Sequence, residues 1–105
     1  MKYIVVFITV SNEKEGKKIA NYIVENKLGA CVNIISKINS IYYWQGNIED
    51  DEEYLLIIKT RKDKFDELVK EVKKLHSYTV PEIIAMPVLL GSDDYLKWID
   101  ETLDR

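Results

Sequence analysis

The chain has 105 residues, of which 47% are hydrophobic and 31% are charged, and its net charge at neutral pH is −3. This length and composition predict one globular domain over residues 1–105 and leave no room for a second domain. The acidic balance gives no electrostatic reason to bind nucleic acid or an anionic membrane, so neither is an expected partner. Because Cys31 is the only cysteine, an internal disulfide is excluded, and a reducing cytoplasm is the simplest compartment.

The first two predicted elements are a buried strand and a helix. The apolar, β-branched run over residues 1–10 predicts the strand. Asn12 and Glu15 then have the spacing of a capping box, and Gly29 supplies the left-handed position that commonly ends a helix. The pattern predicts a helix from about Glu13 to Leu28, whose apolar residues recur at helical spacing: Ile19, Ala20, Ile23 and Val24.

Residues 30–58 predict a β-hairpin that is too long for its own domain. Its first arm, residues 30–45, extends on the order of 50 Å at the usual rise of a strand. A compact chain of this length has a radius of gyration of about 13 Å. The tip is therefore expected to project and to be covered by other subunits. The expected interface residues are Ile41, Tyr42, Tyr43 and Trp44, because aromatic side chains are enriched at the centres of interfaces.

The first arm of the hairpin carries an interrupted apolar face. Ser36 and Ser40 break this face, which indicates a bulge or a change of surroundings. Residues 45–47 form the turn, and an acidic run over residues 49–53 opens the return arm. The five residues expected to share the face are Val32, Ile34, Ile38, Tyr42 and Trp44.

The remaining elements are a helix, a strand and a last helix. An amphipathic pattern predicts a helix near residues 62–75, with an apolar stripe formed by Phe65, Leu68, Val69, Val72 and Leu75. A strand follows over residues 82–89, and Pro87 places it at a sheet edge because proline cannot donate a ladder hydrogen bond. Ser92 caps the last helix. The inner face of this helix is expected to comprise Tyr95, Leu96, Ile99 and Leu103.

The order of these elements, β-α-β-β-α-β followed by a helix, predicts the α+β class. It is the split βαβ arrangement of ferredoxin-like folds, here with a long protruding β-hairpin. In that topology the strands of the antiparallel sheet lie in the spatial order 4-1-3-2. The strand that contains Pro87 is then an edge, as its chemistry requires.

Few residues are candidates for chemistry. No nucleophile, base and orienting acid can be assembled around one His and one Cys, and no glycine-rich phosphate loop is present, so neither an enzyme nor an organic cofactor is expected. Cys31 is either a small packed hydrophobe or a metal ligand. His76 is either a helix-terminal imidazolium stabilised by the helix dipole or a metal ligand that needs partners, including groups from neighbouring subunits. The acidic run 49–53 is either a solvated surface or a site for a hard cation.

Together these segments resemble the CutA divalent-cation tolerance family over nearly the whole chain. The matching residues are Ala30-Cys31-Val32-Asn33-Ile34, Ser40-Ile41-Tyr42 with Trp44 and Gly46, Glu53, Lys59-Thr60, His76 with Tyr78, Val80-Pro81-Glu82-Ile83, Pro87, Gly91, and Tyr95-Leu96 with Trp98.

The resemblance implies a cytoplasmic homotrimer of ferredoxin-like subunits whose hairpins wrap around their neighbours. It also implies a role in the binding and tolerance of copper and other divalent metals, and a fold shared with trimeric nitrogen-regulatory signalling proteins. Some family members have a cysteine where this chain has Ile8, and some have a second histidine where it has Leu75. Of that set only His76 remains, and Cys31 is another family position that is either a metal ligand or part of the core. The alternative function is a non-enzymatic trimeric signalling or scaffold protein that binds a small ligand between subunits.

Overall fold

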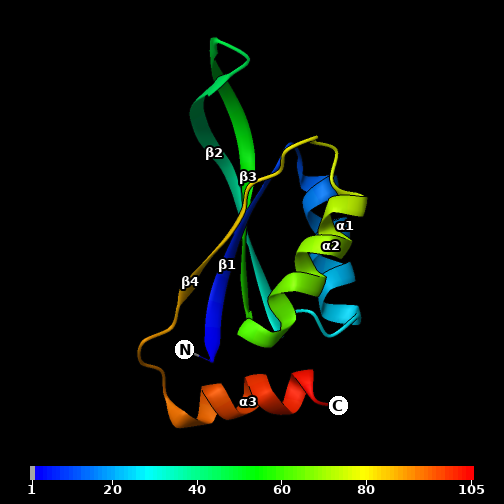
Figure 1. Ribbon diagram of the computed structural model, residues 1–105, viewed down its shortest axis with the longest axis vertical. Coiled ribbons are helices and arrows are strands. Elements are labelled where there is room, and N and C mark those ends of the chain that lie inside the picture. Colours follow the sequence, from blue (N-terminus) through cyan, green and yellow to red (C-terminus); the bar gives the residue numbers. More distant parts are fainter. Residues whose placement is uncertain (1) are drawn as a thin grey trace.

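The computed structural model of the chain describes residues 2–105, so Met1 of the expected domain lies outside it. Four strands form one antiparallel sheet in the order β2-β3-β1-β4, with α1 and α2 on one face and α3 across its lower end (Figure 1). The predicted class and strand order are confirmed. The elements are β1 Tyr3–Val10, α1 Glu13–Glu25, β2 Cys31–Trp44, β3 Asn47–Arg61, α2 Phe65–Leu75, β4 Ile83–Pro87 and α3 Asp93–Leu103.

The core lies between the sheet and the two helices α1 and α2. Alternate residues of β1 point into it, as expected for a strand with one covered face. The predicted stripe of α2 supplies Leu68 and Val72 as fully buried side chains, after a short 3-10 helix over Lys62–Lys64. The other buried members of the core include Ile4, Val6, Ile8, Val10, Ile19, Ile23, Leu28, Leu56 and Ile58. No helix in the described part of the chain is long and apolar enough to cross a membrane.

The hairpin formed by β2 and β3 reaches beyond the rest of the sheet. β1 pairs with β3 only over residues 54–61, so residues 38–53 form a two-stranded ribbon that no third strand flanks. The molecule is 44 Å long and only 25 by 23 Å across, and Figure 1 shows the ribbon projecting above the helices. Gln45 and Gly46, with φ of 51° and 82°, form the tight turn at its tip. Two-stranded hairpins are marginally stable in water by themselves.

A β-bulge in β2 divides the hairpin into two parts. Pairing is interrupted between Ile35 and Ile38, where β2 has one residue more than β3 and Lys37 has a φ of 55°. The predicted break is confirmed, but the predicted single face is wrong. Of its five residues, the two before the bulge lie opposite buried core residues of β3. Ile38, Tyr42 and Trp44, which come after the bulge, lie on the opposite face, which is also the face of Glu53. The bulge causes this change, because one extra residue reverses the alternation of side chains between the two faces.

The N-terminus of α1 is capped as predicted, with one difference. The side-chain oxygen of Asn12 accepts the backbone N–H of Glu15 at 2.8 Å. The Glu15 carboxylate, however, does not return this bond to Asn12. It accepts the backbone N–H of Ser11 at 3.2 Å and that of Ser77 at 2.7 Å. Glu15 therefore ties the start of α1 to the segment that follows α2.

The helix α1 ends at Glu25, three residues earlier than predicted. Lys27, with a φ of 58°, takes the left-handed position that was predicted for Gly29. Gly29 is required for a different reason, which is close packing. A Cβ atom at this position would lie 2.6 Å from a methyl carbon of Ile58 and 2.8 Å from one of Ile23. The chain can therefore pass between helix and sheet only without a side chain here.

The strand β4 is an edge of the sheet, as Pro87 requires, and it is shorter than the predicted 82–89. It pairs with β1 only, so its outer edge is open. Ile84 and Met86 on this strand are 56% and 58% exposed. The open edge and these side chains form a second apolar surface in addition to the ribbon.

The helix α3 packs on the sheet through one part of its predicted inner face. Ser92 caps it by accepting the backbone N–H of Tyr95 at 3.3 Å. Ile99 and Leu103 are buried against Ala30. Tyr95, which was predicted to face inward, is 41% exposed.

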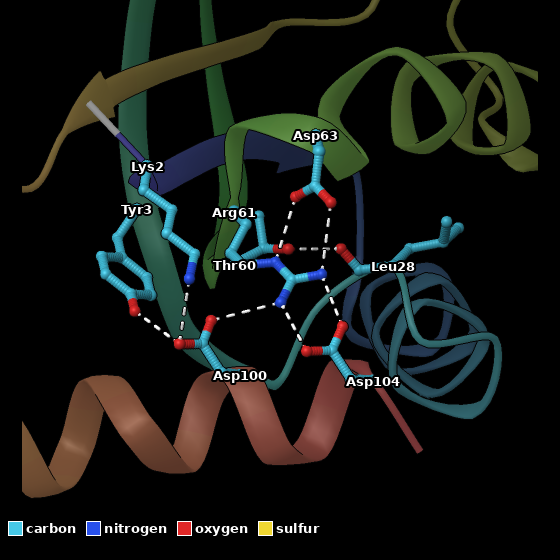
Figure 2. A network of polar contacts seen from close by, with 8 residues as sticks. All are labelled: Lys2, Tyr3, Leu28, Thr60, Arg61, Asp63, Asp100 and Asp104. Atoms are coloured by element: carbon cyan, nitrogen blue, oxygen red, sulfur yellow. Dashed lines mark hydrogen bonds and ion pairs between the residues drawn. The ribbon is translucent and has the colours of Figure 1, made fainter.

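Arg61, at the end of β3, joins α3 to the sheet through an ionic network (Figure 2). Its side chain is only 8% exposed. Its guanidinium group makes five hydrogen bonds to three carboxylates, two to Asp63 at 3.0 and 3.2 Å, one to Asp100 at 3.2 Å and two to Asp104 at 2.8 and 3.0 Å. All five N–H donors of the guanidinium are thereby used.

We expect this network to weaken in acid. Bonds from Tyr3, Lys2 and Arg61 hold the pKa of Asp100 below its ordinary value of 3.8, and bonds from Arg61 do the same for Asp104. A carboxylate with a lowered pKa in the folded state stabilises the fold above its ordinary pKa, and this stability is lost as the pH falls through the lowered value. The melting temperature should therefore decline below about pH 4 through these groups. In the variant Asp100→Asn/Asp104→Asn the decline should be smaller, and an equal decline in both proteins would contradict the assignment.

Candidate functional site

The segment between α2 and β4, residues 76–82, crosses the end of β1 and reaches the base of the ribbon (Figure 1). Three contacts from three elements hold it. Glu15 of α1 accepts the N–H of Ser77, His76 bonds to the end of β1, and Tyr78 bonds to Glu53 of β3. The segment is therefore positioned by tertiary contacts rather than by regular secondary structure.

His76 has no exposed side-chain surface. Its Nε2 donates to the carbonyl oxygen of Thr9 at 2.7 Å, and its Nδ1 accepts the backbone N–H of Tyr78 at 3.0 Å. These two bonds are those of a neutral imidazole with its proton on Nε2. In this arrangement neither nitrogen has a lone pair free for a metal ion.

Cys31 lies at the start of β2 and is partly exposed. Cys31 pairs with Lys59 of β3, and Lys59 pairs with Val5 of β1. His76 bonds to Thr9, which lies four residues further along β1. Four residues along a strand correspond to about 13 Å, so the fold does not bring Cys31 and His76 together. Among residues 2–105, no three His, Cys, Asp or Glu side chains are grouped so that they could hold a metal ion. One copy of the chain therefore does not form the metal site expected from the sequence.

A cleft of about 680 Å³ lies between residues 77–82 and the ribbon. Because of the bulge in β2, Tyr42 and Trp44 lie on the same face of the hairpin as Glu53 and line this cleft. Its volume is typical of sites that bind small molecules. Three aromatic rings and two carboxylates form much of its wall: Tyr42, Trp44, Tyr78, Glu53 and Glu82. Hydroxyl and aliphatic groups form the rest.

The two carboxylates of the cleft have unusual surroundings. Glu53 is only 5% exposed, and its Oε2 accepts the hydroxyl proton of Tyr78 at 2.7 Å. Burial and this bond raise the pKa of Tyr78, so its hydroxyl group stays neutral. Loss of solvent and the nearby charge of Glu53 raise the pKa of Glu82. Residues 50–52 of the acidic run are exposed, whereas Glu53 is buried, so the solvated interpretation is wrong for Glu53.

The expected interface residues lie at the tip of the ribbon. Ile41 and Tyr43 are 68% and 76% exposed, and Tyr42 and Trp44 are about 40% exposed. Ile48, on the return arm, is as exposed as Ile41 and was not singled out from the sequence. Five exposed large apolar side chains at one tip are unusual for a monomer in water.

Comparison with known proteins identifies the family. Residues 4–102 match the family described as CutA1 divalent ion tolerance protein. The chain belongs to this family. The resemblance to CutA proteins predicted from the sequence is thereby confirmed.

Individual CutA proteins match over nearly the full chain. The divalent-cation tolerance protein CutA of Thermus thermophilus is 48% identical over 92% of this chain and 94% of its own length. The solved structure of the protein from the same organism superposes with a TM-score of 0.93 at 47% identity, covering 95% of this chain and 97% of that one. CutA1 from Oryza sativa superposes with a TM-score of 0.94 at 46% identity, over 97% of this chain and 94% of that one.

Other CutA relatives are longer or are named for other compartments. The chloroplastic CutA of Arabidopsis thaliana is 52% identical over 91% of this chain, which spans only 53% of that protein. The chain likewise spans about half, 54%, of the chloroplastic CutA 1 of Oryza sativa. A solved structure from Archaeoglobus fulgidus is described as a periplasmic divalent cation tolerance protein. The relatives therefore do not share one compartment, and the cytoplasmic location expected here remains a prediction.

Proposed function

We propose that this chain acts as a cytoplasmic homotrimer in the tolerance of copper and other divalent cations, without enzymatic activity. Membership of the CutA1 family supports the role in cation tolerance. The observation that supports assembly is the ribbon of residues 38–53, which no third strand of its own chain flanks. Its exposed aromatic tip and the open edge of β4 are the surfaces that we expect neighbouring subunits to cover.

We further propose that metal ions are held at boundaries between subunits. A single copy does not group three suitable ligands among its described residues, whereas a three-fold assembly repeats each side chain around an axis. Cys31, which is partly exposed, is the ligand that we assign to cuprous ions, because thiolates favour that soft ion. The exposed carboxylates of residues 50–52 are the ligands that we assign to harder ions.

Calorimetric titration of the wild type, His76→Ala and Cys31→Ser with cuprous, cupric and zinc ions tests this proposal. We expect His76→Ala to keep the metal affinities of the wild type, because both imidazole nitrogens already have protein partners. The same variant should lose about 2 kcal/mol of unfolding free energy, because the carbonyl of Thr9 and the N–H of Tyr78 lose buried bonds. Cys31→Ser should weaken cuprous binding. Loss of metal binding in His76→Ala alone, or no binding by the wild type, would contradict the proposal.

The cleft supports a second candidate function, that of a trimeric signalling or scaffold protein that binds a small molecule. Its volume of about 680 Å³ and its mixed aromatic and polar wall are those of a ligand site rather than of a packing defect. The ribbon forms one wall, so a ligand there would alter the same element that we expect to contact neighbouring subunits. Binding would in that way be communicated to the assembly. A rise in melting temperature with small molecules in metal-free buffer tests this function.

A further inference from the structure

His76, the single histidine of the chain, is enclosed by its own subunit. Its side chain has no exposed surface, so the bonds of the imidazole do not depend on what a neighbouring subunit covers. Nε2 donates to the carbonyl oxygen of Thr9 at 2.7 Å, and Nδ1 accepts the backbone N–H of Tyr78 at 3.0 Å. The backbone N–H of His76 donates to the carbonyl oxygen of Val72 at 2.9 Å. The ring is therefore fixed to β1 and to the end of α2, and Tyr78 is fixed to the ring.

A carboxylate lies beside the ring nitrogen that carries no proton. Oε2 of Glu15 is 3.7 Å from Nδ1 of His76, and it accepts the backbone N–H of Ser77 at 2.7 Å. Burial acts to raise the pKa of Glu15, but the bonds from Ser77 and Ser11 outweigh it and hold this pKa below its ordinary value of 4.5. Glu15 therefore stays negatively charged over the range of about pH 5 to 8 in which histidine side chains titrate.

The other elements around the imidazole contribute neutral groups. The contacts from β1 and α2 are the carbonyl groups already named. The ring of Tyr78 lies 4.7 Å from the imidazole between centroids, and its hydroxyl is neutral because burial and the bond to Glu53 of β3 raise its pKa. Glu53 itself lies behind this hydroxyl. In the described part of the chain, Glu15 is thus the one charged group within ion-pair distance of the ring.

We infer that His76 holds residues 77–82 as a pH-sensitive latch. While the imidazole is neutral, Nδ1 accepts the N–H of Tyr78 and keeps the segment at the end of β1. When a proton from solvent binds at Nδ1, this nitrogen becomes a donor, and two donors cannot bond to each other. The bond to Tyr78 is then lost, and the new N–H group turns to Oε2 of Glu15, with which it forms a charge-assisted bond. The bond from Nε2 to Thr9 persists, because Nε2 donates in both states.

Release of Tyr78 reaches the ribbon through one further contact. The hydroxyl of Tyr78 donates to Glu53 at 2.7 Å, and Glu53 is the residue of β3 just before the part that pairs with β1. In mild acid, residues 77–82 become mobile and this support at the base of the ribbon weakens, while α1 and the imidazole keep their places. The latch works within each subunit and needs neither a metal ion nor a ligand. It adds a response to pH that the proposed function does not include.

Nuclear magnetic resonance of the wild type in metal-free buffer tests this inference. Because the chain has one histidine, nitrogen-15 labelling of histidine gives unassignable overlap no chance, and the two ring nitrogens report their protons directly. At about pH 8 we expect a neutral ring with its proton on Nε2. As Nδ1 gains a proton in acid, the protection factor of the Tyr78 amide against hydrogen exchange should fall about tenfold or more, as for a lost hydrogen bond. The amides of Leu56 and Ile58 in the core should stay protected.

Matched variants assign the roles. Glu15→Gln keeps an oxygen for the N–H of Ser77 but loses the charge that attracts the protonated ring, so a lower pH should be needed to protonate Nδ1. Glu13→Gln is its control, because it removes an exposed carboxylate two residues away on α1, and it should titrate like the wild type. His76→Gln has no titrating ring, so the protection of the Tyr78 amide should no longer depend on protonation at this position. If His76→Gln does not fold, the wild type and the two glutamate variants still decide the question.

Each result supports the latch or overturns it. A fall in protection at Tyr78 that coincides with protonation of His76, and that moves to lower pH in Glu15→Gln, supports it. A ring that stays neutral down to about pH 5, or one that gains its proton without a fall in protection at Tyr78, overturns it. Equal titration of Glu15→Gln and Glu13→Gln overturns the part assigned to Glu15. Simultaneous loss of protection at Leu56 and Ile58 also overturns it, because acid then unfolds the whole subunit.

Discussion

Replacing Tyr43 and Trp44 by glutamate is expected to dissociate the assembly while leaving each subunit folded. Both side chains lie on the ribbon beyond the last residue that pairs with β1, so the core does not depend on them. Aromatic anchors at the centre of an interface contribute about 2 kcal/mol or more each. Two of them correspond to a loss of about three orders of magnitude in the association constant.

Sedimentation equilibrium over a range of concentrations measures this effect. The wild type is expected to have three times the 12.3 kDa mass of one chain, and the double variant should approach the mass of one chain on dilution. Val24→Glu is the matched control, because it places the same charge at a partly exposed apolar position of α1, away from the ribbon. An unchanged mass of the double variant at low concentration would show that the tip does not anchor the assembly.

Replacing Arg61 by methionine is expected to give the largest loss of stability within a subunit. The substitution keeps an apolar stem of similar length but leaves Asp63, Asp100 and Asp104 close together without their shared cation. Hydrogen bonds to charged groups contribute about 1.5–3 kcal/mol, and because Asp63 and Asp104 are more than 60% exposed, we expect a loss of about 2–3 kcal/mol. The helix α3 should be the first part of the molecule to detach.

Urea unfolding at one fixed chain concentration measures the total loss, and hydrogen exchange of the backbone amides shows whether α3 loses protection first. Lys62→Met is the control, because it removes a cation from the exposed neighbouring position. Arg61→Lys should recover only part of the stability, since a lysine cannot donate five hydrogen bonds in a plane. A loss no greater than that of Lys62→Met would contradict the role assigned to Arg61.

Features with a local chemical cause were predictable from the sequence. Asn12 and Ser92 cap their helices because a short polar side chain can accept a nearby backbone N–H wherever the chain turns into a helix. Pro87 lies in an edge strand because it lacks the N–H that a central strand needs on both sides. The long hairpin followed from strand patterning alone, and so did the place where its first arm is interrupted.

The candidate site was much less predictable. Glu53, Tyr78 and Glu82 were singled out only through the family resemblance, and no other pattern distinguished Glu53 from its acidic neighbours. Their one local signal is that Glu53 directly precedes the apolar run 54–58, where a strand enters the sheet. No pattern in the sequence indicates that residues 76–82 lie against this strand, because the segment is irregular and is held by single hydrogen bonds from distant elements.

The sequence by itself therefore determined the elements, their order, the edge strand and the projecting ribbon, since each depends on residues that are close together along the chain. Only the tertiary structure decided which chemistry these elements support. The bulge reversed the face of the ribbon, and the tertiary structure gave both ring nitrogens of His76 hydrogen-bond partners. Burial also placed the carboxylate of Glu53 against the hydroxyl group of Tyr78 in a cleft. The physical reason is that hydrogen-bond partners and loss of solvent, which set the protonation and availability of a side chain, come from residues far away in the sequence.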